Sequence, residues 1–368
     1  MNQNKEIRGF RKILYSKKAA PYLFCLPFII SFLIFFLYPT INTVLMSFQK
    51  IEGFNNVKWI GLNNYKRLFN IHFYNALKSS TIYMVCMVSI MLILPITIAT
   101  FLNSKILKFK NFFRSAIFVP TLTSVIVAGI AFRLMFGETE AGLFNSIILK
   151  LGGEIVAWKT GYVTGMIMMV TLAAWRELGI NMVYCLSALQ SIPEELYEAA
   201  DIDGANAVQK FVFVTIPQVK PIIIYILTLT ILNGYRMFTE GYVYWNETNP
   251  GDIGLTIVRY IYQQAFQRND FGMGSAIGVV LLAIVLTVNM FQLNFFGLFK
   301  KEDESAQKND VRTGFHPVYA GVPDHAVSGL LPGHRITSGR AGDIPGRYEV
   351  LPEPGRHEMV QLSQPVHI

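Results

Sequence analysis

The chain has 368 residues, of which 52% are hydrophobic and only 15% are charged, and its mean hydropathy is +0.39. Soluble domains carry about 25% charged residues, and a soluble chain of this length could not bury so much apolar surface. The three cysteines show neither a CxxC spacing nor a Cys/His cluster, so they support neither a disulfide framework nor a zinc site. The net charge of +8 does not indicate nucleic-acid binding, because the basic residues flank apolar blocks, where they orient membrane helices.

The apolar residues fall into blocks of about 20, which is the length needed to cross a roughly 30 Å hydrocarbon core. The pattern predicts a polytopic membrane protein with six membrane helices. Their expected ranges are 22–48, 80–102, 115–136, 161–186, 221–242 and 275–298. Pro95 and Pro120 lie inside two of these ranges, where each removes a backbone hydrogen bond and is expected to kink its helix.

The distribution of basic residues predicts the orientation. We expect residues 1–20 to be a basic cytoplasmic N-terminus, and the first helix to be retained, because it is too long for a signal peptide and lacks an A-x-A site. Lys300 and Lys301 follow the sixth helix on the same side. The loop after the second helix has four basic residues and no acidic residue, and the basic residues are Lys105, Lys108, Lys110 and Arg114. The first outer loop is also rich in lysine, so the orientation depends on the majority of the loops.

Composition changes after residue 301. Residues 302–368 are rich in Gly and Pro and hold five of the six histidines, which are His316, His325, His334, His357 and His367. This segment has too few apolar residues to form a core, so we expect a disordered tail, and its switch from Lys to Arg suggests a foreign origin. The predicted membrane domain is therefore residues 21–301.

The fourth loop, about residues 191–217, is the segment most informative about function. Ser191 and Glu194 have the spacing of a capping box, so a short helix is expected to begin here and to break near Gly204, where a residue without Cβ permits a sharp turn. A second helix, about 205–214, would lead back to the membrane. Five acidic residues and no basic residue lie between 194 and 203, namely Glu194, Glu195, Glu198, Asp201 and Asp203.

Glu194, Glu198 and Asp201 recur at helical spacing and should share one face. The small residues Ala199, Ala200 and Gly204 would let a partner approach closely, and a basic, grooved cytosolic protein is the natural complement. The alternative interpretation is a solvated loop that only connects two membrane spans.

The motif Glu198-Ala199-Ala200, then Gly204, then Val214-x-Ile216-Pro217 after nine residues, resembles the EAA motif of ABC-importer permeases. The family usually has Ile and Leu where this chain has Val214 and Ile216. The resemblance implies that this loop forms the coupling helices that dock into a cleft of an ATPase subunit. It assigns ATPase coupling to Glu194, Glu195, Glu198, Ala199, Ala200, Asp201, Asp203, Gly204, Ile216 and Pro217.

Further segments within residues 11–301 resemble sugar permeases. The segments are Gly61-Leu62-Asn63-Asn64-Tyr65 in the first outer loop, 250–256 and 260–266 in the last outer loop, and 271–276 at the entry to the last helix. More narrowly, 15–22, 132–138 and 253–264 resemble arabino-oligosaccharide permeases of Gram-positive bacteria.

The resemblance implies an all-α membrane protein with the type I ABC-importer permease (MetI-like) fold, located in the bacterial plasma membrane with both termini in the cytoplasm. Its implied partners are a second permease subunit in a heterodimer, two ATPase subunits and an extracellular sugar-binding lipoprotein, with an oligosaccharide as substrate. The chain contains no Gly-Lys dipeptide and hence no Walker A loop, so ATP and Mg would be bound by the partner ATPase.

Ionisable residues inside membrane spans usually face a cavity or a partner. Arg236 and Glu240 are four residues apart on the predicted fifth helix and can pair on one face, whereas Arg176 and Glu177 are adjacent and point differently, so at least one of them needs a partner elsewhere. The candidate substrate pathway consists of Arg176, Glu177, Asn181, Asn233, Tyr235, Arg236 and Glu240. Simple packing between helices is the alternative role, and for Tyr244 and Trp245 an interfacial aromatic belt is the favoured interpretation.

Two other function classes compete with a permease. A membrane-embedded transferase would need carboxylates or histidines clustered at one membrane face, and the only acidic cluster here is the one in the fourth loop. A self-sufficient secondary transporter would show paired broken helices in an inverted repeat, which the sequence does not show. An ABC permease for another oligosaccharide or small solute is the nearest alternative.

Overall fold

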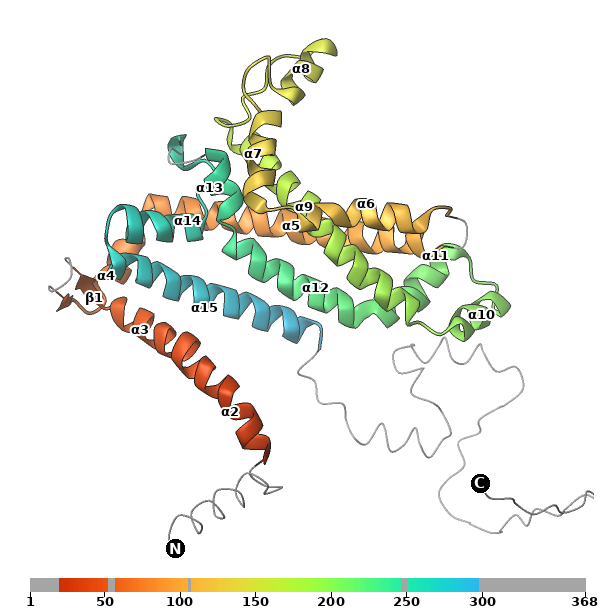
Figure 1. Ribbon diagram of the computed structural model, residues 1–368, viewed down its shortest axis with the longest axis horizontal. Helices are drawn as coiled ribbons and strands as arrows, with labels where there is room; N and C mark the ends of the chain where they lie inside the picture. The colour runs from red at the N-terminus through yellow and green to blue at the C-terminus, as the bar shows by residue number, and fades with distance from the viewer. Residues whose placement is uncertain (1–19, 52–56, 105–106, 246–249, 298–368) are drawn as a thin grey trace, which may run out of the picture. The chain divides into compact units, whose positions relative to one another are not determined.

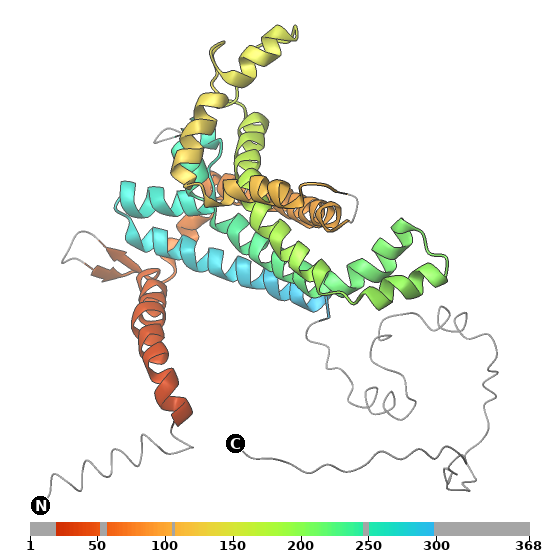
Figure 2. The same ribbon diagram turned by 45° about the vertical axis from the view of Figure 1, so that its right-hand side comes forward.

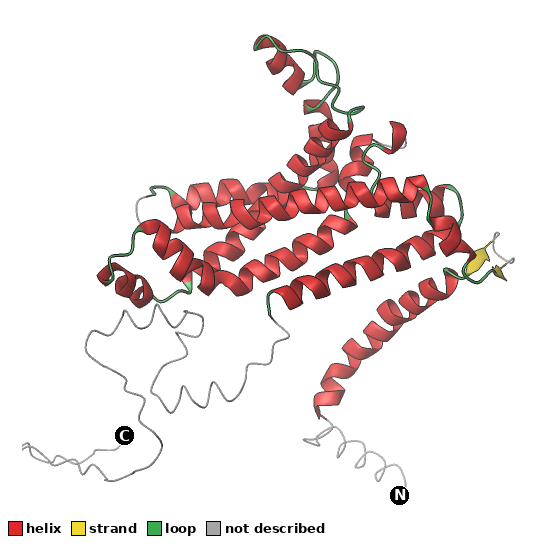
Figure 3. Ribbon diagram, turned by 180° about the vertical axis from the view of Figure 1, so that it is seen from behind, coloured by secondary structure: helices red, strands yellow, loops and turns green. Residues whose placement is uncertain are grey.

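The computed structural model describes residues 20–51, 57–104, 107–245 and 250–297. The predicted tail, 302–368, and all of the predicted N-terminal segment except Ala20 lie outside these residues. Contacts divide the chain into Met1–Lys300 and Lys301–Ile368, and every described residue belongs to the first unit. Helices make up nearly all of the described residues, together with one short two-stranded hairpin (Figure 3).

The first half of the chain contains the N-terminal helical span, a two-stranded hairpin, the long helix α5 and three shorter helices after it. The elements are α2 (Ala20–Phe32), the π-helical turn η1 (Leu33–Leu37), α3 (Tyr38–Met46), β1 (Gln49–Ile51), β2 (Val57–Trp59), α4 (Asn63–Leu68), α5 (Ile71–Asn103), α6 (Lys110–Leu122), α7 (Val125–Met135) and α8 (Leu143–Lys150). The strands β1 and β2 pair antiparallel, with Lys50 opposite Lys58.

The second half contains the fourth loop and the last two long helices. The elements are α9 (Tyr162–Gln190), α10 (Glu194–Ile202), α11 (Ala207–Lys210), the π-helical turn η2 (Phe211–Thr215), α12 (Ile216–Arg236), α13 (Thr239–Trp245), the 3-10 turn η3 (Pro250–Asp252), α14 (Ile257–Tyr262), the π-helical turn η4 (Gln263–Gln267) and α15 (Phe271–Phe295).

Five helical stretches in the described residues are long and apolar enough to cross a membrane, or six if the bent pair α6–α7 counts as one span. The five are Tyr22–Met46, Ile71–Asn103, Tyr162–Gln190, Ala207–Trp245 and Phe271–Phe295. The prediction of six apolar spans agrees with this arrangement. Several boundaries differ, however, because α5 begins well before residue 80 and α15 begins before residue 275.

The third span is not the continuous helix that the sequence predicts. The axes of α6 and α7 differ by 98° at a break after Leu122, where Thr123 and Ser124 are extended (Figure 2). Two hydrogen bonds between Arg176 of α9 and the break hold it: the Thr121 hydroxyl donates to the Arg176 carbonyl at 2.8 Å, and Arg176 Nε donates to the Thr123 carbonyl at 3.4 Å. Backbone groups freed at a helix break inside a membrane need such partners. Pro120 lies in the last turn of α6, whereas Pro95 lies within α5.

Two apolar cores share the helices α5 and α12. One core joins them to α7, α9 and α13, and the other joins them to α4, α14 and α15. The helix α5 packs along α9 and α12, and α15 packs along α3 and α12 (Figure 1). The span Tyr22–Met46, in contrast, buries none of its most apolar window against the described residues.

The segment Gly61-Leu62-Asn63-Asn64-Tyr65 follows the β1–β2 hairpin, and its side chains bond to the end of the first membrane span and to β1. Asn64 is fully buried, and its side-chain amide donates to the carbonyls of Ser47 and Gln49, each at 2.9 Å. The hydroxyls of Tyr65 and Ser47 are 2.7 Å apart. A buried amide that satisfies the carbonyls of the turn residue Ser47 and the strand residue Gln49 fixes the chain locally, which gives this motif a structural role.

Candidate functional site

The fourth loop folds into a helical hairpin. The helix α10 begins at Glu194, with Glu194 and Glu195 in its first turn, and the chain reverses at Gly204, where φ is +74°. Only glycine adopts this conformation without strain. The structure therefore has the helix and the turn that the sequence predicts.

The predicted capping box at Ser191 is wrong. The Ser191 hydroxyl donates to the Ala188 carbonyl and closes α9, while Pro193 precedes α10 without a side-chain cap. The capping box of this loop belongs instead to α11, where Asn206 and Gln209 each accept from the other's backbone N–H. The helix then runs on through η2 into α12, so the predicted second helix, 205–214, has no end before the membrane span.

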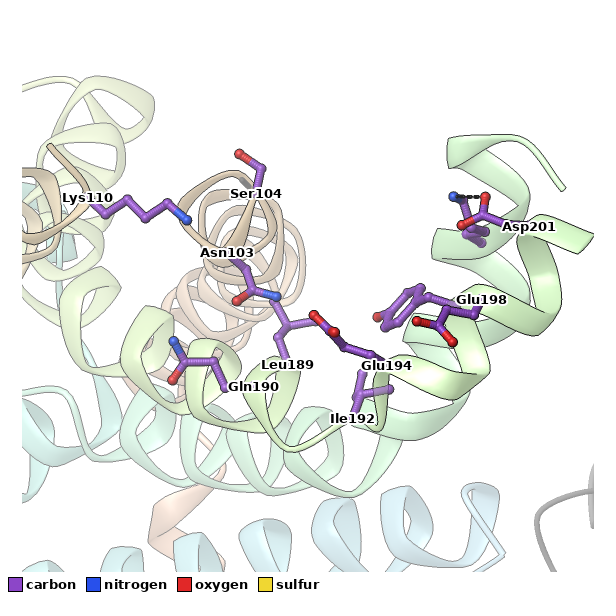
Figure 4. Close-up of a pocket in the computed structure, with 11 residues that line it drawn as sticks. Asn103, Ser104, Lys110, Leu189, Gln190, Ile192, Glu194, Glu198 and Asp201 are labelled. Carbon is purple, nitrogen blue, oxygen red and sulfur yellow. Dashed lines mark hydrogen bonds and ion pairs between the residues drawn. The ribbon is translucent and has the colours of Figure 1, made fainter. Parts of the chain in front are cut away.

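The acidic residues of α10 face a cleft of about 720 Å³. Glu194, Glu198 and Asp201 line one side of it, as their spacing predicts, and Lys110 of α6 extends from the other side (Figure 4). Lys210 of α11 forms an ion pair with Asp201 at 2.6 Å. The other residues that line the cleft are Asn103 and Ser104 at the end of α5, Leu189, Gln190 and Ile192 at and just beyond the end of α9, and Tyr197 of α10.

The tip of the hairpin is apolar and open. Ile202 is 87% exposed and Val208 is 70% exposed, and a Cβ added at Gly204 would meet no atom within 4 Å. Ala199, Asp203 and Glu195 are exposed as well, whereas Ala200 is half-buried. The sequence analysis missed Ile202 and Val208, although each is an isolated aliphatic residue in a polar loop, which is a usable signal for a contact surface.

The hairpin is fastened to the membrane helices. The Tyr197 hydroxyl of α10 lies 2.9 Å from the buried Thr215 hydroxyl of η2. Ile192 and Ile216 pack against the α5–α9–α12 core, and Pro217 is exposed at the start of α12. The loop is therefore packed on the ends of α9 and α12.

A second, polar pocket of about 330 Å³ opens where the helix breaks between α12 and α13. We call it the polar pocket, and its lining residues are Tyr83, Glu177, Asn233, Arg236, Met237, Phe238, Thr239 and Glu240. Four of the seven predicted pathway residues thus lie together.

The predicted ion pair between Arg236 and Glu240 is wrong. The helix α12 ends at Arg236, and the extended conformation of Met237 turns the chain before α13 begins, so the spacing of four residues no longer brings the two side chains together. Glu240 instead pairs with Arg176 of α9, with Nη1 and Oε1 3.3 Å apart. The expected remote partner of Arg176 is therefore Glu240.

Two other predicted pathway residues lie outside the polar pocket. The Asn181 amide is buried and donates to the Met91 sulfur at 3.3 Å and to the Glu177 carbonyl at 3.0 Å. Tyr235 is also buried, with its hydroxyl 3.3 Å from that of Thr81. Both side chains join helices to one another.

The interpretation of Tyr244 and Trp245 as an interfacial belt is wrong. Their exposed fractions are 1% and 0%, and Trp245 Nε1 donates to the Lys159 carbonyl at 2.8 Å. They form part of the core of the chain because α13 packs against α7 and α9.

The sequence analysis also missed Arg259 on α14. It is 2% exposed, and its Nη1 donates to the Gly241 carbonyl at 2.7 Å. Burial lowers the pKa of Arg259 to about 10, so the guanidinium stays protonated at neutral pH. The guanidinium fixes α13, and with it one wall of the polar pocket, to α14.

Residues 80–297 match the family model described as "Binding-protein-dependent transport system inner membrane component". The chain is 52% identical over 294 residues to the arabinooligosaccharides transport system permease protein AraP of Bacillus subtilis (strain 168), which covers 80% of this chain and 94% of the relative. It is 49% identical over 289 residues to the protein of the same name from Halalkalibacterium halodurans, which covers 78% of this chain and 91% of the relative.

A solved structure has the same fold. It is a bacterial alginate ABC transporter in complex with an alginate pentasaccharide-bound periplasmic protein, and it aligns with a TM-score of 0.69 at 21% identity over 79% of this chain and 99% of the matched chain. The family model spans more than half of this chain, and the relatives are covered over most of their length. The chain therefore belongs to the family of binding-protein-dependent transport system inner membrane components, the multi-pass permease subunits of ABC importers.

Proposed function

We propose that this permease subunit imports arabino-oligosaccharides, and that the hairpin 191–217 couples it to a cytosolic ATPase that binds ATP and Mg. A second permease subunit completes the membrane core, two ATPase subunits bind on the cytosolic side, and an extracellular sugar-binding lipoprotein delivers the substrate. Both termini and the hairpin are on the cytoplasmic side. The sugar class rests on the names of the two relatives that are about half identical to this chain.

The observation that carries the coupling role is the hairpin tip. An exposed left-handed glycine lies between two exposed aliphatic residues, Ile202 and Val208, next to an acidic helix face. A surface of this kind suits a partner with an apolar groove and a basic rim. The Tyr197–Thr215 hydrogen bond and the packing of Ile192 and Ile216 would transmit a force on the tip to α9 and α12.

The substitution Gly204→Asp tests this role. We expect it to abolish transport and retention of the ATPase during purification, because a charged side chain would enter the docking surface, while membrane insertion stays normal. Uptake of labelled sugar and the ATPase content of the purified complex are the two measurements.

The matched control is Gly152→Asp. Gly152 also has a left-handed conformation, with φ of +82°, and a Cβ added there meets no atom within 4 Å. Both substitutions thus carry the same backbone strain, and only the surroundings in the assembly differ. Normal uptake by Gly204→Asp at a normal protein level would refute the coupling role, and so would an equal loss in both variants.

The substrate is tested by uptake in cells with and without this chain. We expect deletion to abolish uptake of labelled arabino-oligosaccharides and to leave uptake of maltodextrins unchanged. Loss of a different sugar would discard the proposed substrate and keep the permease assignment. Unchanged uptake of every sugar tested would show that the chain serves another class of solute.

A further inference from the structure

The polar pocket contains charged groups that the described residues leave unpaired. Glu240 is neutralised by Arg176, whereas the carboxylate of Glu177 and the guanidinium of Arg236 form no hydrogen bond or ion pair with the part of the chain that the structure describes. Glu177 is half-buried and Arg236 is exposed. The pocket therefore presents one free hydrogen-bond acceptor group and one free donor group to a ligand.

The hydrogen-bonding functions of these two groups suit sugar hydroxyls. A hydroxyl can donate to the Glu177 carboxylate and accept from the Arg236 guanidinium, since it has both functions. Asn233, Tyr83 and Thr239 add uncharged polar groups from α12, α5 and α13. Charge-assisted hydrogen bonds of this kind are roughly twice as strong as those between neutral groups.

The same charges disfavour an acidic sugar. With Arg176 included, the two carboxylates and two guanidinium groups around the pocket cancel, so a neutral ligand leaves the site neutral. A sugar carboxylate would add an unbalanced negative charge beside Glu177 in the low-dielectric interior of a membrane protein, where like charges repel strongly.

We infer that Glu177 is a specificity-determining residue, which makes the polar pocket accept neutral oligosaccharides and reject oligosaccharides that carry uronic acids. This inference rests on the proposed function, since it assumes that a sugar passes through the polar pocket. Arg236 is the second member of the pair and sets the charge balance against which Glu177 acts.

The test is direct sugar binding to the purified importer without its binding protein, measured by saturation-transfer NMR. The probes are arabinotriose, which is neutral, and trigalacturonic acid, which carries carboxylates. We expect Glu177→Gln to raise the ratio of acidic to neutral binding about tenfold, because the local negative charge is lost. Glu140→Gln removes an exposed carboxylate elsewhere and should leave the ratio unchanged.

A second substitution separates charge from structure. Adding Arg236→Gln to Glu177→Gln restores the charge balance and should return the ratio to the wild-type value, which a merely structural defect would not do. Arg236→Gln alone should lower the ratio, and this variant decides the matter if Glu177→Gln gives no folded complex.

The outcomes distinguish a failure of the proposed function from a failure of the inference about Glu177. A wild-type complex that binds neither sugar would refute passage through the polar pocket and the sugar assignment together. A complex that binds arabinotriose, but whose ratio is unchanged by Glu177→Gln or not restored by the double substitution, would overturn the inference about Glu177 alone.

Discussion

At the scale of single residues, Gly179 allows close contact between the helices α9 and α6. A Cβ at this position of α9 would lie 2.5 Å from the Ile117 carbonyl oxygen and 2.7 Å from the Thr121 hydroxyl of α6. Since the nearest atom belongs to the backbone, the helices themselves would have to separate. Overpacking of this kind costs about 1–3 kcal/mol.

We therefore expect Gly179→Ala to lower the thermal stability of the purified permease, measured by the loss of monodisperse protein on heating. The matched control is Gly278→Ala on α15, where the nearest atom, Ile261 Cδ1, lies 4.0 Å away. An alanine there should be neutral or stabilising because of its higher helix propensity. Equal stability of the two variants would contradict the close packing of α6 on α9.

Sequence patterns at this scale succeed only where the helix is continuous. The shared face of Glu194, Glu198 and Asp201 follows from their spacing because α10 is regular. The pairing of Arg236 with Glu240 fails because the helix is interrupted between them, at Met237 and Phe238. Neither residue is a Gly or Pro, the usual signals of a break. The true partner, Arg176, is 64 residues away in the chain and cannot be found from spacing.

At the scale of elements, one buried asparagine organises the segment 137–161. Asn145 of α8 is fully buried; its amide donates to the carbonyls of Gly137 and Val156, and its oxygen accepts from the Val156 N–H and from Trp158 Nε1. These bonds join Gly137 to Trp158 across a segment with little regular structure besides α8. Each buried partner left without its hydrogen bond costs about 1–3 kcal/mol.

We expect Asn145→Ala to open this segment and to increase its cleavage in limited proteolysis, while the membrane helices remain protected. Ser146→Ala is the control, because the Ser146 hydroxyl bonds only to the Leu143 carbonyl one turn earlier. Wild-type resistance of Asn145→Ala to protease would show that packing of Phe144 on Phe136 and Trp158 suffices to hold the segment.

Hydropathy predicts the membrane elements well and their interruptions poorly. Blocks of apolar residues mark the spans regardless of their neighbours, so the number and order of spans follow from the sequence. The 98° turn between α6 and α7 does not, because Thr123 and Ser124 take extended conformations that depend on bonds from Arg176 and on contact with α9. Tertiary contacts, rather than local propensity, decide such positions.

At the scale of the whole molecule, the helices α5 and α12 separate two apolar cores. Met87 and Ile226 face one core, while Met84 and Leu227 face the other. Near-continuous apolar sequences carry no amphipathic pattern, so the sequence could indicate that these helices are membrane spans but not which side meets which core. The most apolar part of Tyr22–Met46 is exposed and suits lipid or a neighbouring subunit as its environment.

The helix α9 connects both candidate sites in one unbroken rod. Glu177 lies in the polar pocket, and Gln190, in the last turn, lines the cleft beside the hairpin, about 20 Å further along the axis. If sugar binds beside Glu177, near the middle of α9, and the ATPase binds beside its C-terminal end, any coupling between the two sites is reciprocal. The factor by which a docked ATPase changes the affinity for sugar equals the factor by which bound sugar changes the affinity for the ATPase. Such coupling would signal an occupied pocket to the ATPase without a separate sensor.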